Sequence, residues 1–205
     1  MNIDHIAHKY NVDMSQPNPI IVSAGGRAEL IELWKELGYK IGAEVGVQRG
    51  DFAKDMLKNI PGLIYYGIDA WTCYEGYKDI IASRHGQGSF DRLYEDAKNQ
   101  LAPYPNVNLI RKWSVDAAKD FTDNSLDFVY IDGNHDFAHT TEDIAAWLPK
   151  IRVEGMICGH DYARVNKPEL TIHCKDAVDG WTNAHGDKLI VYYRQRSPNW
   201  LFFKK

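Results

Sequence analysis

The sequence lacks the features of membrane-spanning, secreted and nucleic-acid-binding proteins. No apolar run in its 205 residues approaches the ~18 residues of a membrane span, and residues 63–68 are typical of the longest runs. The first ten residues include Asp4 and Lys9 and no apolar stretch, so a secretory signal is not expected. Basic residues number 24 against 28 acidic ones, a formal charge of −4. We therefore expect neither a nucleic-acid nor a membrane partner.

Cysteine is also scarce. Cys73, Cys158 and Cys174 form an odd, scattered set with no CxxC pair, which is typical of free thiols in a reducing cytoplasm. Hydrophobic residues make up 44% and charged residues 25% of the chain, an ordinary mixture for a globular protein. A chain of this length buries a sizeable core, so it needs neither disulfides nor a structural metal to fold. We therefore expect a cytoplasmic protein built mainly of one domain.

Short apolar runs alternate with helical patterns along the chain. Parallel strands need crossovers of about a dozen or more residues, whereas the strands of a hairpin are antiparallel. The alternation predicts an α/β fold in which helices cover both faces of a mostly parallel sheet, with one antiparallel strand near an edge. Strands are predicted at residues 40–47, 63–69, 107–112, 126–132 and 155–160, followed by a hairpin of strands at 188–194 and 199–204.

The helical patterns lie between these strands. Gly38 should end a first helix at residues 27–37, and Ser89, Ser114 and Thr140 are expected to cap three later helices. Two further helices are predicted at residues 51–58 and at about 170–183.

Glycines and an acidic residue follow the first two strands of the predicted sheet. Residues 44–50 read Glu-Val-Gly-Val-Gln-Arg-Gly, and Asp69 ends the next strand, 23 residues after Gly46. Glycine lets a loop approach a ligand closely, and a carboxylate at the second strand end can accept hydrogen bonds from ribose hydroxyls. Alone, either feature is also compatible with an ordinary turn or a solvated strand end. Together they predict a nucleoside site.

The same loop favours S-adenosylmethionine over a dinucleotide. A dinucleotide site would show Gly-x-Gly-x-x-Gly, with helix N–H groups facing a pyrophosphate. This loop lacks that spacing and contains Glu44, a carboxylate suited to a ligand with a positively charged amino-acid end.

At these positions and at three later segments the sequence resembles class I S-adenosylmethionine-dependent methyltransferases. The later segments are Tyr-Ile-Asp-Gly-Asn-His-Asp at 130–136, Ala-Ala-Trp-Leu-Pro-Lys at 145–150 and Gly-Met-Ile-Cys-Gly-His-Asp-Tyr at 155–162. They are similar to the small stand-alone branch called methyltransferase domain family 24, which is related to O-methyltransferases acting on catechols and macrolide sugars. The resemblance covers residues 27–205 and leaves residues 1–26 as an N-terminal arm or cap.

The resemblance implies a Rossmann-like, seven-stranded sheet whose last strand is antiparallel. It also implies a role in cofactor binding for each matching position. The methionine part of S-adenosylmethionine would be surrounded by Glu44, Gly46, Val47 and Gly50, and its amino group would lie beside Asp132. The ribose hydroxyls would be held by Asp69, and the adenine would lie near Trp71, Trp113 and Ser114. For Trp71 and Trp113, plain core packing remains an equally open interpretation.

Methyl transfer to oxygen needs an acceptor hydroxyl that is losing its proton. A divalent cation could lower the pKa of the hydroxyl, or a side-chain base could take the proton. Carboxylates bind metal at the corresponding strand ends of the resembling metal-dependent enzymes, so a Mg²⁺ or Mn²⁺ site of Asp132, His160 and Asp161 is predicted. The imidazole of His160 would favour an ion softer than Mg²⁺. The predicted catalytic residues are Asp132 at the reacting centre and His135 or His160 as general base.

We therefore predict an O-methyltransferase that acts on a hydroxylated small molecule, such as a sugar or a catechol-like ring, with or without metal assistance. Two alternatives stay open: a metal-dependent hydrolase or nuclease built on the histidines and aspartates, and a non-catalytic cofactor-binding protein. Residues 74–88 are predicted to form a substrate lid or pocket wall. The identity of the acceptor, the formation of a homo-oligomer and the role of residues 1–26 are left open.

Overall fold

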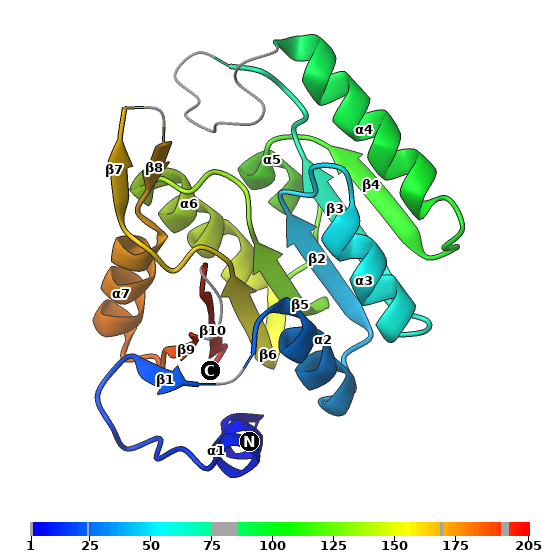
Figure 1. The fold of residues 1–205 in the computed structure, drawn as a ribbon. Helices are drawn as coiled ribbons and strands as arrows, with labels where there is room; N and C mark the ends of the chain where they lie inside the picture. The colour runs from blue at the N-terminus through cyan, green and yellow to red at the C-terminus, as the bar shows by residue number, and fades with distance from the viewer. Residues whose placement is uncertain (1, 24, 75–85, 169, 194–196) are drawn as a thin grey trace.

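The computed structural model describes residues 2–23, 25–74, 86–168, 170–193 and 197–205. Most of the segment expected to form a lid falls at residues 75–85, outside the described residues. The described part of the chain forms one large sheet with helices on both faces, together with a separate two-stranded hairpin (Figure 1).

The main sheet has eight strands, in the order β1-β9-β10-β6-β5-β2-β3-β4. Neighbouring strands are parallel except where β10 is involved, since β10 runs antiparallel to both β6 and β9. The strands are β1 (Ile20–Val22), β2 (Ile41–Val45), β3 (Ile64–Asp69), β4 (Val107–Arg111), β5 (Leu126–Ile131), β6 (Ile151–Gly159), β9 (Ile190–Tyr192) and β10 (Asn199–Phe203).

The topology confirms the predicted α/β fold and corrects the number of strands. The sheet is mostly parallel and its last strand is antiparallel, as expected. It has eight strands rather than seven, because Ile20–Val22 add β1 at the edge, parallel to β9. A run of three apolar residues is too short to predict a strand without its partner, which lies about 170 residues further along the chain. The antiparallel strand also lies inside the sheet, between β6 and β9, rather than near an edge.

Residues 1–26, expected to form an arm or cap, therefore contribute both β1 and a helix, α1 (Asn2–Tyr10). Ile6 of α1 is fully buried in the same core cluster as Ile20 and Val22 of β1. The boundary at residue 26 stays a prediction.

One face of the sheet is covered by α1, α2 (Arg27–Glu36) and α3 (Asp51–Asn59). The large side chains of these helices pack against alternate residues of the central strand β5. Trp34 of α2 stacks on Phe128 with ring centroids 4.1 Å apart, and Phe52 of α3 contacts Tyr130 at 4.7 Å. Burial of such aromatic surface is the main stabilising contribution of this layer.

The other face is covered by α5 (Ser114–Ala118), α6 (Phe137–Trp147) and α7 (Cys174–His185). Val129 and Ile131 of β5 point to this side, where they join Ile144 and Trp147 of α6 in a second core cluster. Successive strand residues face opposite sides of a sheet, so a strand buried on both faces is apolar along its length, as the sequence of β5 is.

The remaining elements lie outside this sheet. α4 (Gln87–Leu101) packs beside α3, the short helix η1 (Leu148–Lys150) follows α6, and β7 (Val165–Lys167) pairs antiparallel with β8 (Leu170–Ile172). The helix expected at about residues 170–183 therefore begins four residues late, because β8 occupies the start of that segment.

Three predicted helix caps are wrong by a few residues. Gly86, Trp113 and Asp136 precede the helices, so Ser89, Ser114 and Thr140 lie inside the first turns. Asp136 is the better cap for α6, because its carboxylate accepts a hydrogen bond from the N–H of His139 at 2.9 Å.

Cys73, Cys158 and Cys174 are free thiols, with Cys158 and Cys174 buried. In the described part of the chain, no helix has both the length and the apolar composition needed to cross a membrane.

Candidate functional site

A crevice of about 550 Å³ opens where β2, β3 and β5 end. In parallel α/β sheets this carboxyl edge is where ligands bind, and the volume is that of a pocket for a small molecule or cofactor. Of the predicted cofactor-binding residues, all except Gly50 line the crevice: Glu44, Gly46, Val47, Asp69, Trp71, Trp113, Ser114 and Asp132.

The two glycines of the first loop have different roles. Gly46 has φ +92°, and a Cβ atom at this position would overlap the carbonyl oxygen of Asp132. Glycine at this position therefore lets the end of β2 touch the end of β5. Gly50 has φ +88° and begins α3, with Leu101 and Ala97 as its neighbours. Gly50 does not line the crevice, and its contact with the cofactor stays a prediction.

Asp69 is held by the backbone of the loops around it. Its carboxylate accepts hydrogen bonds from the N–H groups of Val47 at 3.1 Å, Gln48 at 3.0 Å and Trp71 at 2.7 Å. Burial raises the pKa of Asp69, although these three hydrogen bonds favour its ionised form. The side chain therefore fixes the glycine loop, and contact with ribose hydroxyls stays a prediction.

Glu44 is a buried acid at the inner end of the crevice. The residue is only 2% exposed, and its carboxylate accepts a short hydrogen bond from the hydroxyl of Tyr65. Burial raises the pKa of Glu44 to about 8, because a carboxylate loses its hydration there. The sequence predicted that Glu44 would lie in the loop region of the site, but it did not predict that the carboxylate would be buried.

The two predicted tryptophans differ in their surroundings. Trp71 is 1% exposed, packs against Tyr94 with ring centroids 4.7 Å apart, and donates its indole N–H to the carbonyl of Gln48 at 2.7 Å. Trp113 is 47% exposed at the crevice rim, where its ring meets that of Tyr74 edge to face at 5.3 Å. Trp71 is thus packed in the core at the crevice wall, whereas Trp113 is largely exposed, and adenine contact by either ring stays a prediction.

Ser114 connects the crevice to a buried acid that the sequence analysis missed. Its hydroxyl oxygen accepts the indole N–H of Trp147 at 2.8 Å and is hydrogen-bonded to the carboxyl of Asp143. Burial raises the pKa of Asp143 to about 7. Asp143 lies on the buried face of α6, one turn before Trp147, and an acid at such a position was the available signal.

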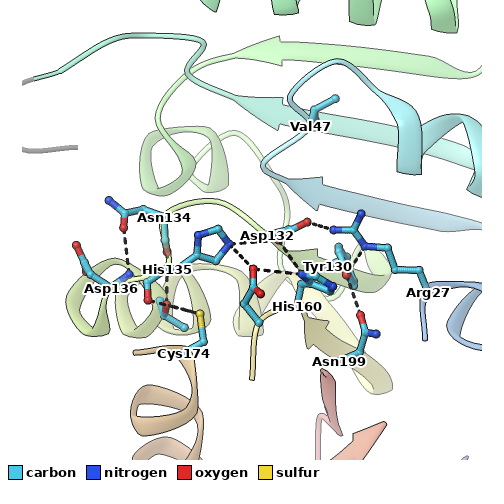
Figure 2. Close-up of polar contacts among 12 residues, drawn as sticks. Arg27, Val47, Tyr130, Asp132, Asn134, His135, Asp136, His160, Cys174 and Asn199 are labelled. Carbon is cyan, nitrogen blue, oxygen red and sulfur yellow. Dashed lines mark hydrogen bonds and ion pairs between the residues drawn. The ribbon is translucent and has the colours of Figure 1, made fainter. Parts of the chain in front are cut away.

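A charged centre of Asp132, His135, His160 and Asp161 lies against this crevice, at the ends of β5 and β6. Figure 2 labels Asp132, His135 and His160 of this centre. Nε2 of His135 lies 3.3 Å from Oδ1 of Asp132 and 3.1 Å from Oδ2 of Asp161. Nδ1 of His160 lies 3.2 Å from Oδ2 of Asp161 and 3.7 Å from Oδ1 of Asp132. The structure thus brings together all the residues predicted to be catalytic or metal-binding.

The neighbours of His135 and Asp161 shift the pKa values of these two groups in favour of their charged forms. Burial disfavours a charged His135, but hydrogen bonds and charges from Asp132 and Asp161 outweigh it and raise its pKa to about 10. Burial likewise opposes ionisation of Asp161, but hydrogen bonds from His135 and His160 hold its pKa well below the usual range. Asp161 also has φ +51°, a backbone conformation rare outside glycine and frequent at functional sites.

Arg27, at the start of α2, reaches the same centre and was missed by the sequence analysis. Its Nη2 forms a close ion pair with Oδ2 of Asp132, and its Nε donates to the hydroxyl of Tyr130 at 3.1 Å. The guanidinium lies over the ring of Phe52, 4.8 Å from the centroid. Sequence pattern gave no signal for this contact, because it depends on how α2 crosses β5.

The sequence of the chain matches a family model described as a methyltransferase domain over residues 43–162, more than half of its length. The chain belongs to the methyltransferase domain family. By family and fold it is a class I S-adenosylmethionine-dependent methyltransferase, as the resemblance predicted.

A curated relative of this methyltransferase covers only part of either chain. The protein y4gI of Sinorhizobium fredii, itself described as uncharacterized, is 32% identical over 97 residues. These residues are 47% of the present chain and 10% of the relative, so the chain spans about a tenth of that protein's length.

Solved structures share the fold at low sequence identity. A Staphylococcus aureus protein provisionally assigned as a caffeoyl-CoA O-methyltransferase is 12% identical, with a TM-score of 0.65 over 98% of this chain and 90% of that one. An O-methyltransferase from Bacillus cereus in complex with SAH is 11% identical, with a TM-score of 0.60 over 99% and 90%. The N-methyltransferase NodS from Bradyrhizobium japonicum is 11% identical, with a TM-score of 0.59 over 87% and 94%. Because both oxygen and nitrogen acceptors occur, the fold does not specify the acceptor atom.

Three residues of the charged centre fit a divalent cation. Asp132, His135 and Asp161 each offer one ligand atom, and these atoms lie within 4.8 Å of one another. Two carboxylate oxygens with an imidazole nitrogen suit Mn²⁺ or a similar ion better than Mg²⁺. His135 belongs to this group, and the predicted metal set of Asp132, His160 and Asp161 stays a prediction.

Proposed function

We propose that this methyltransferase transfers the methyl group of S-adenosylmethionine to a hydroxyl oxygen of a polar small molecule, such as a sugar or a catechol-like ring. One observation carries the proposal: Asp132 belongs both to the wall of the crevice and to the charged centre. A donor in the crevice and an acceptor over the centre would therefore meet at one residue. The family match gives no support to the hydrolase alternative.

The protein's main task in this reaction is positioning. When bound, S-adenosylmethionine supplies a sulfonium methyl group, which an acceptor oxygen must approach in line at ~3–3.5 Å. The rigid junction of Gly46 with the backbone of Asp132 would hold the donor side still. Polar side chains of the centre and of Asn134, which also lines the crevice, would orient the acceptor hydroxyl.

The acceptor proton would go to His160 rather than to His135. With a pKa of about 10, His135 already carries a proton at neutral pH and serves to hold Asp132 and Asp161 together. His160 lies beside the same carboxylates, and proton transfer to its ring would be stabilised by Asp161, whose Oδ2 lies 3.2 Å from Nδ1.

A divalent cation is the second route to an ionised acceptor. Asp132, His135 and Asp161 would hold it, with His135 giving up its proton, and the cation would lower the pKa of the acceptor hydroxyl. The two routes differ in their response to chelators, so they can be separated by experiment.

The proposal is tested with the purified protein, methyl-labelled S-adenosylmethionine and a panel of sugars and catechols. We expect S-adenosylhomocysteine to raise the melting temperature even in EDTA, and mass spectrometry to find one labelled methyl group on a hydroxylated product. EDTA would abolish turnover, and Mn²⁺ would restore it, if the cation route operates. Cofactor binding without product from any acceptor would favour the non-catalytic alternative, and absence of binding would contradict the proposal.

The remaining expectations on partners and location are part of the same proposal. A polar small-molecule acceptor, no nucleic-acid partner and a cytoplasmic location are consistent with the net charge of −4 and with the three free thiols. Size-exclusion chromatography with light scattering would determine whether the protein forms a homo-oligomer.

A further inference from the structure

An ion pair and an exposed aromatic ring lie in different parts of the crevice wall. Arg27 and Asp132 form the ion pair, beside the end of β5, whereas Trp113 lies between β4 and α5. S-Adenosylmethionine has the same polarity, with a zwitterionic amino-acid group at one end and a flat adenine at the other. If the crevice binds this cofactor, as proposed above, the charges direct its amino-acid end toward Arg27.

The guanidinium of Arg27 is fixed in place but not fully used. Nε and Nη2 are engaged by Tyr130 and Asp132, and Phe52 supports the flat face of the group. Among the described residues, no hydrogen-bond acceptor is found for Nη1. The side chain is still 35% exposed, and the residue lines the crevice. A preordered guanidinium with a free edge is suited to a carboxylate, which it can bind through two oxygens.

We propose that Arg27 is a cofactor-binding residue that recognises the α-carboxylate of the methionine part of S-adenosylmethionine. Asp132, its ion-pair partner, would face the neighbouring α-ammonium group. The two side chains would then form a clamp for the zwitterion, with each charge of the ligand opposite a charge of the protein. This inference rests on the proposed use of the crevice for S-adenosylmethionine.

The second arginine of the crevice lacks these features. Arg49 is 57% exposed, and its Nε pairs with Asp51 at 2.8 Å on the surface. No aromatic ring is found beneath its guanidinium among the described residues. An ordered, partly desolvated cation binds an anion more strongly than a hydrated surface cation, so Arg27 is the better carboxylate partner.

The test compares two ligands by calorimetry on wild type and Arg27→Met. S-Adenosylhomocysteine carries the amino-acid part, whereas 5′-methylthioadenosine keeps the nucleoside and the thioether sulfur but lacks it. We expect Arg27→Met to lower the affinity for S-adenosylhomocysteine by about 10- to 100-fold and the affinity for 5′-methylthioadenosine by less than about threefold. Arg27→Lys should recover part of the lost affinity, because it keeps the charge without the planar fork.

Arg152→Met is the matched control. Arg152 also pairs with an aspartate, Asp127 at 2.6 Å, and lies over an aromatic ring, that of Tyr39 at 5.2 Å, but at the opposite end of the sheet. Its loss should change the affinity for both ligands by less than about threefold.

A measurement on the wild-type protein keeps the inference testable if Arg27→Met does not fold. Decarboxylated S-adenosylhomocysteine lacks only the α-carboxylate, and we expect it to bind at least about tenfold more weakly than the parent compound. Equal affinity for these two compounds would overturn the role of Arg27. An Arg27→Met variant that loses affinity equally for S-adenosylhomocysteine and 5′-methylthioadenosine would also overturn it. A wild-type protein that binds no adenosyl ligand would overturn the proposed function as well.

Discussion

Strand β5 carries an aspartate–arginine pair at each end, and the two pairs have opposite characters. Near the amino end, Asp127 accepts the N–H groups of Lys40 at 2.6 Å and Ile41 at 2.9 Å and the Nε of Arg152 at 2.6 Å. At the carboxyl end, Asp132 meets Arg27 through one oxygen and His135 through the other.

The difference lies in what remains available to a ligand. Burial opposes ionisation of Asp127, but hydrogen bonds from two backbone N–H groups and from Arg152 outweigh burial and lower the pKa of Asp127. The ionised carboxylate is therefore stabilised by hydrogen bonds within the protein. The carboxyl end instead gathers two aspartates, two histidines and an arginine beside a crevice, with a backbone φ of +51° at Asp161. We infer that the salt bridge at the amino end serves stability, whereas the one at the carboxyl end lies where a ligand would bind, as proposed above.

The largest expected difference between the ends is in catalysis. Asp161→Asn should lower kcat by about 1,000-fold, because it weakens both the orientation of the histidines and any cation site. Asp127→Asn should leave kcat within about threefold and lower the free energy of unfolding by about 1–3 kcal/mol. Initial rates at saturating cofactor and urea denaturation measure the two effects. A comparable loss of kcat in both variants would remove the distinction between the ends.

Two glycines with positive φ extend the comparison to the backbone. Gly46, at the carboxyl end, has no room for a Cβ atom beside Asp132, whereas Gly62, in the turn before β3, has φ +81° and open space around it. Gly46→Ala should destabilise the fold by about 3 kcal/mol or more, and Gly62→Ala by about 1 kcal/mol. Similar denaturation midpoints for the two variants would show that the backbone of Asp132 moves at little cost to accommodate a Cβ atom at position 46.

The smallest expected effect concerns how the free energy of unfolding depends on pH. The contributions of Glu44 and Asp127 should change with pH in opposite directions. The pKa of Glu44 is raised in the folded state, so the unfolded state ionises first and stability falls as the pH rises from about 4.5 to 8. Glu44→Gln should therefore stabilise the cofactor-free protein on the order of 2 kcal/mol at pH 8 and hardly at pH 4.

Asp127, with its lowered pKa, has the opposite sign. Its stabilising contribution is present above the unfolded-state pKa of about 4 and is lost as the pH falls through the folded-state value. Urea denaturation across the pH range for Glu44→Gln and Asp127→Asn checks both slopes. Parallel slopes would mean that Glu44 is solvated rather than buried.

The parts of the fold and site that follow local pattern were predictable from the sequence. The apolar run of β5 and the acid after it placed Asp132 at a strand end, and the same reasoning placed Asp69 and Asp161. Because parallel strands share one carboxyl edge, their convergence followed from the topology alone.

The parts that depend on packing between distant segments were not predictable. Arg27 reaches Asp132 only because α2 crosses β5 at a particular angle, and β1 exists only because β9 offers it an edge. The burial of Glu44 and Asp143 likewise reflects neighbours contributed by other elements, Tyr65 and Ser114. A single sequence shows the side chain in each of these cases but not its partner.

Gly46 touches the backbone of Asp132, so a side chain cannot be added at position 46. We therefore expect this position to vary little during evolution. The opposite side of the centre is bordered by less buried elements. No residue of β7 or β8 is buried, and the N–H of His173, just after β8, donates to the carbonyl of His135 at 2.7 Å. Descendants of such a protein that acquire new acceptors should therefore diverge in the β7–β8 hairpin and at the start of α6, while the glycine junction persists unchanged.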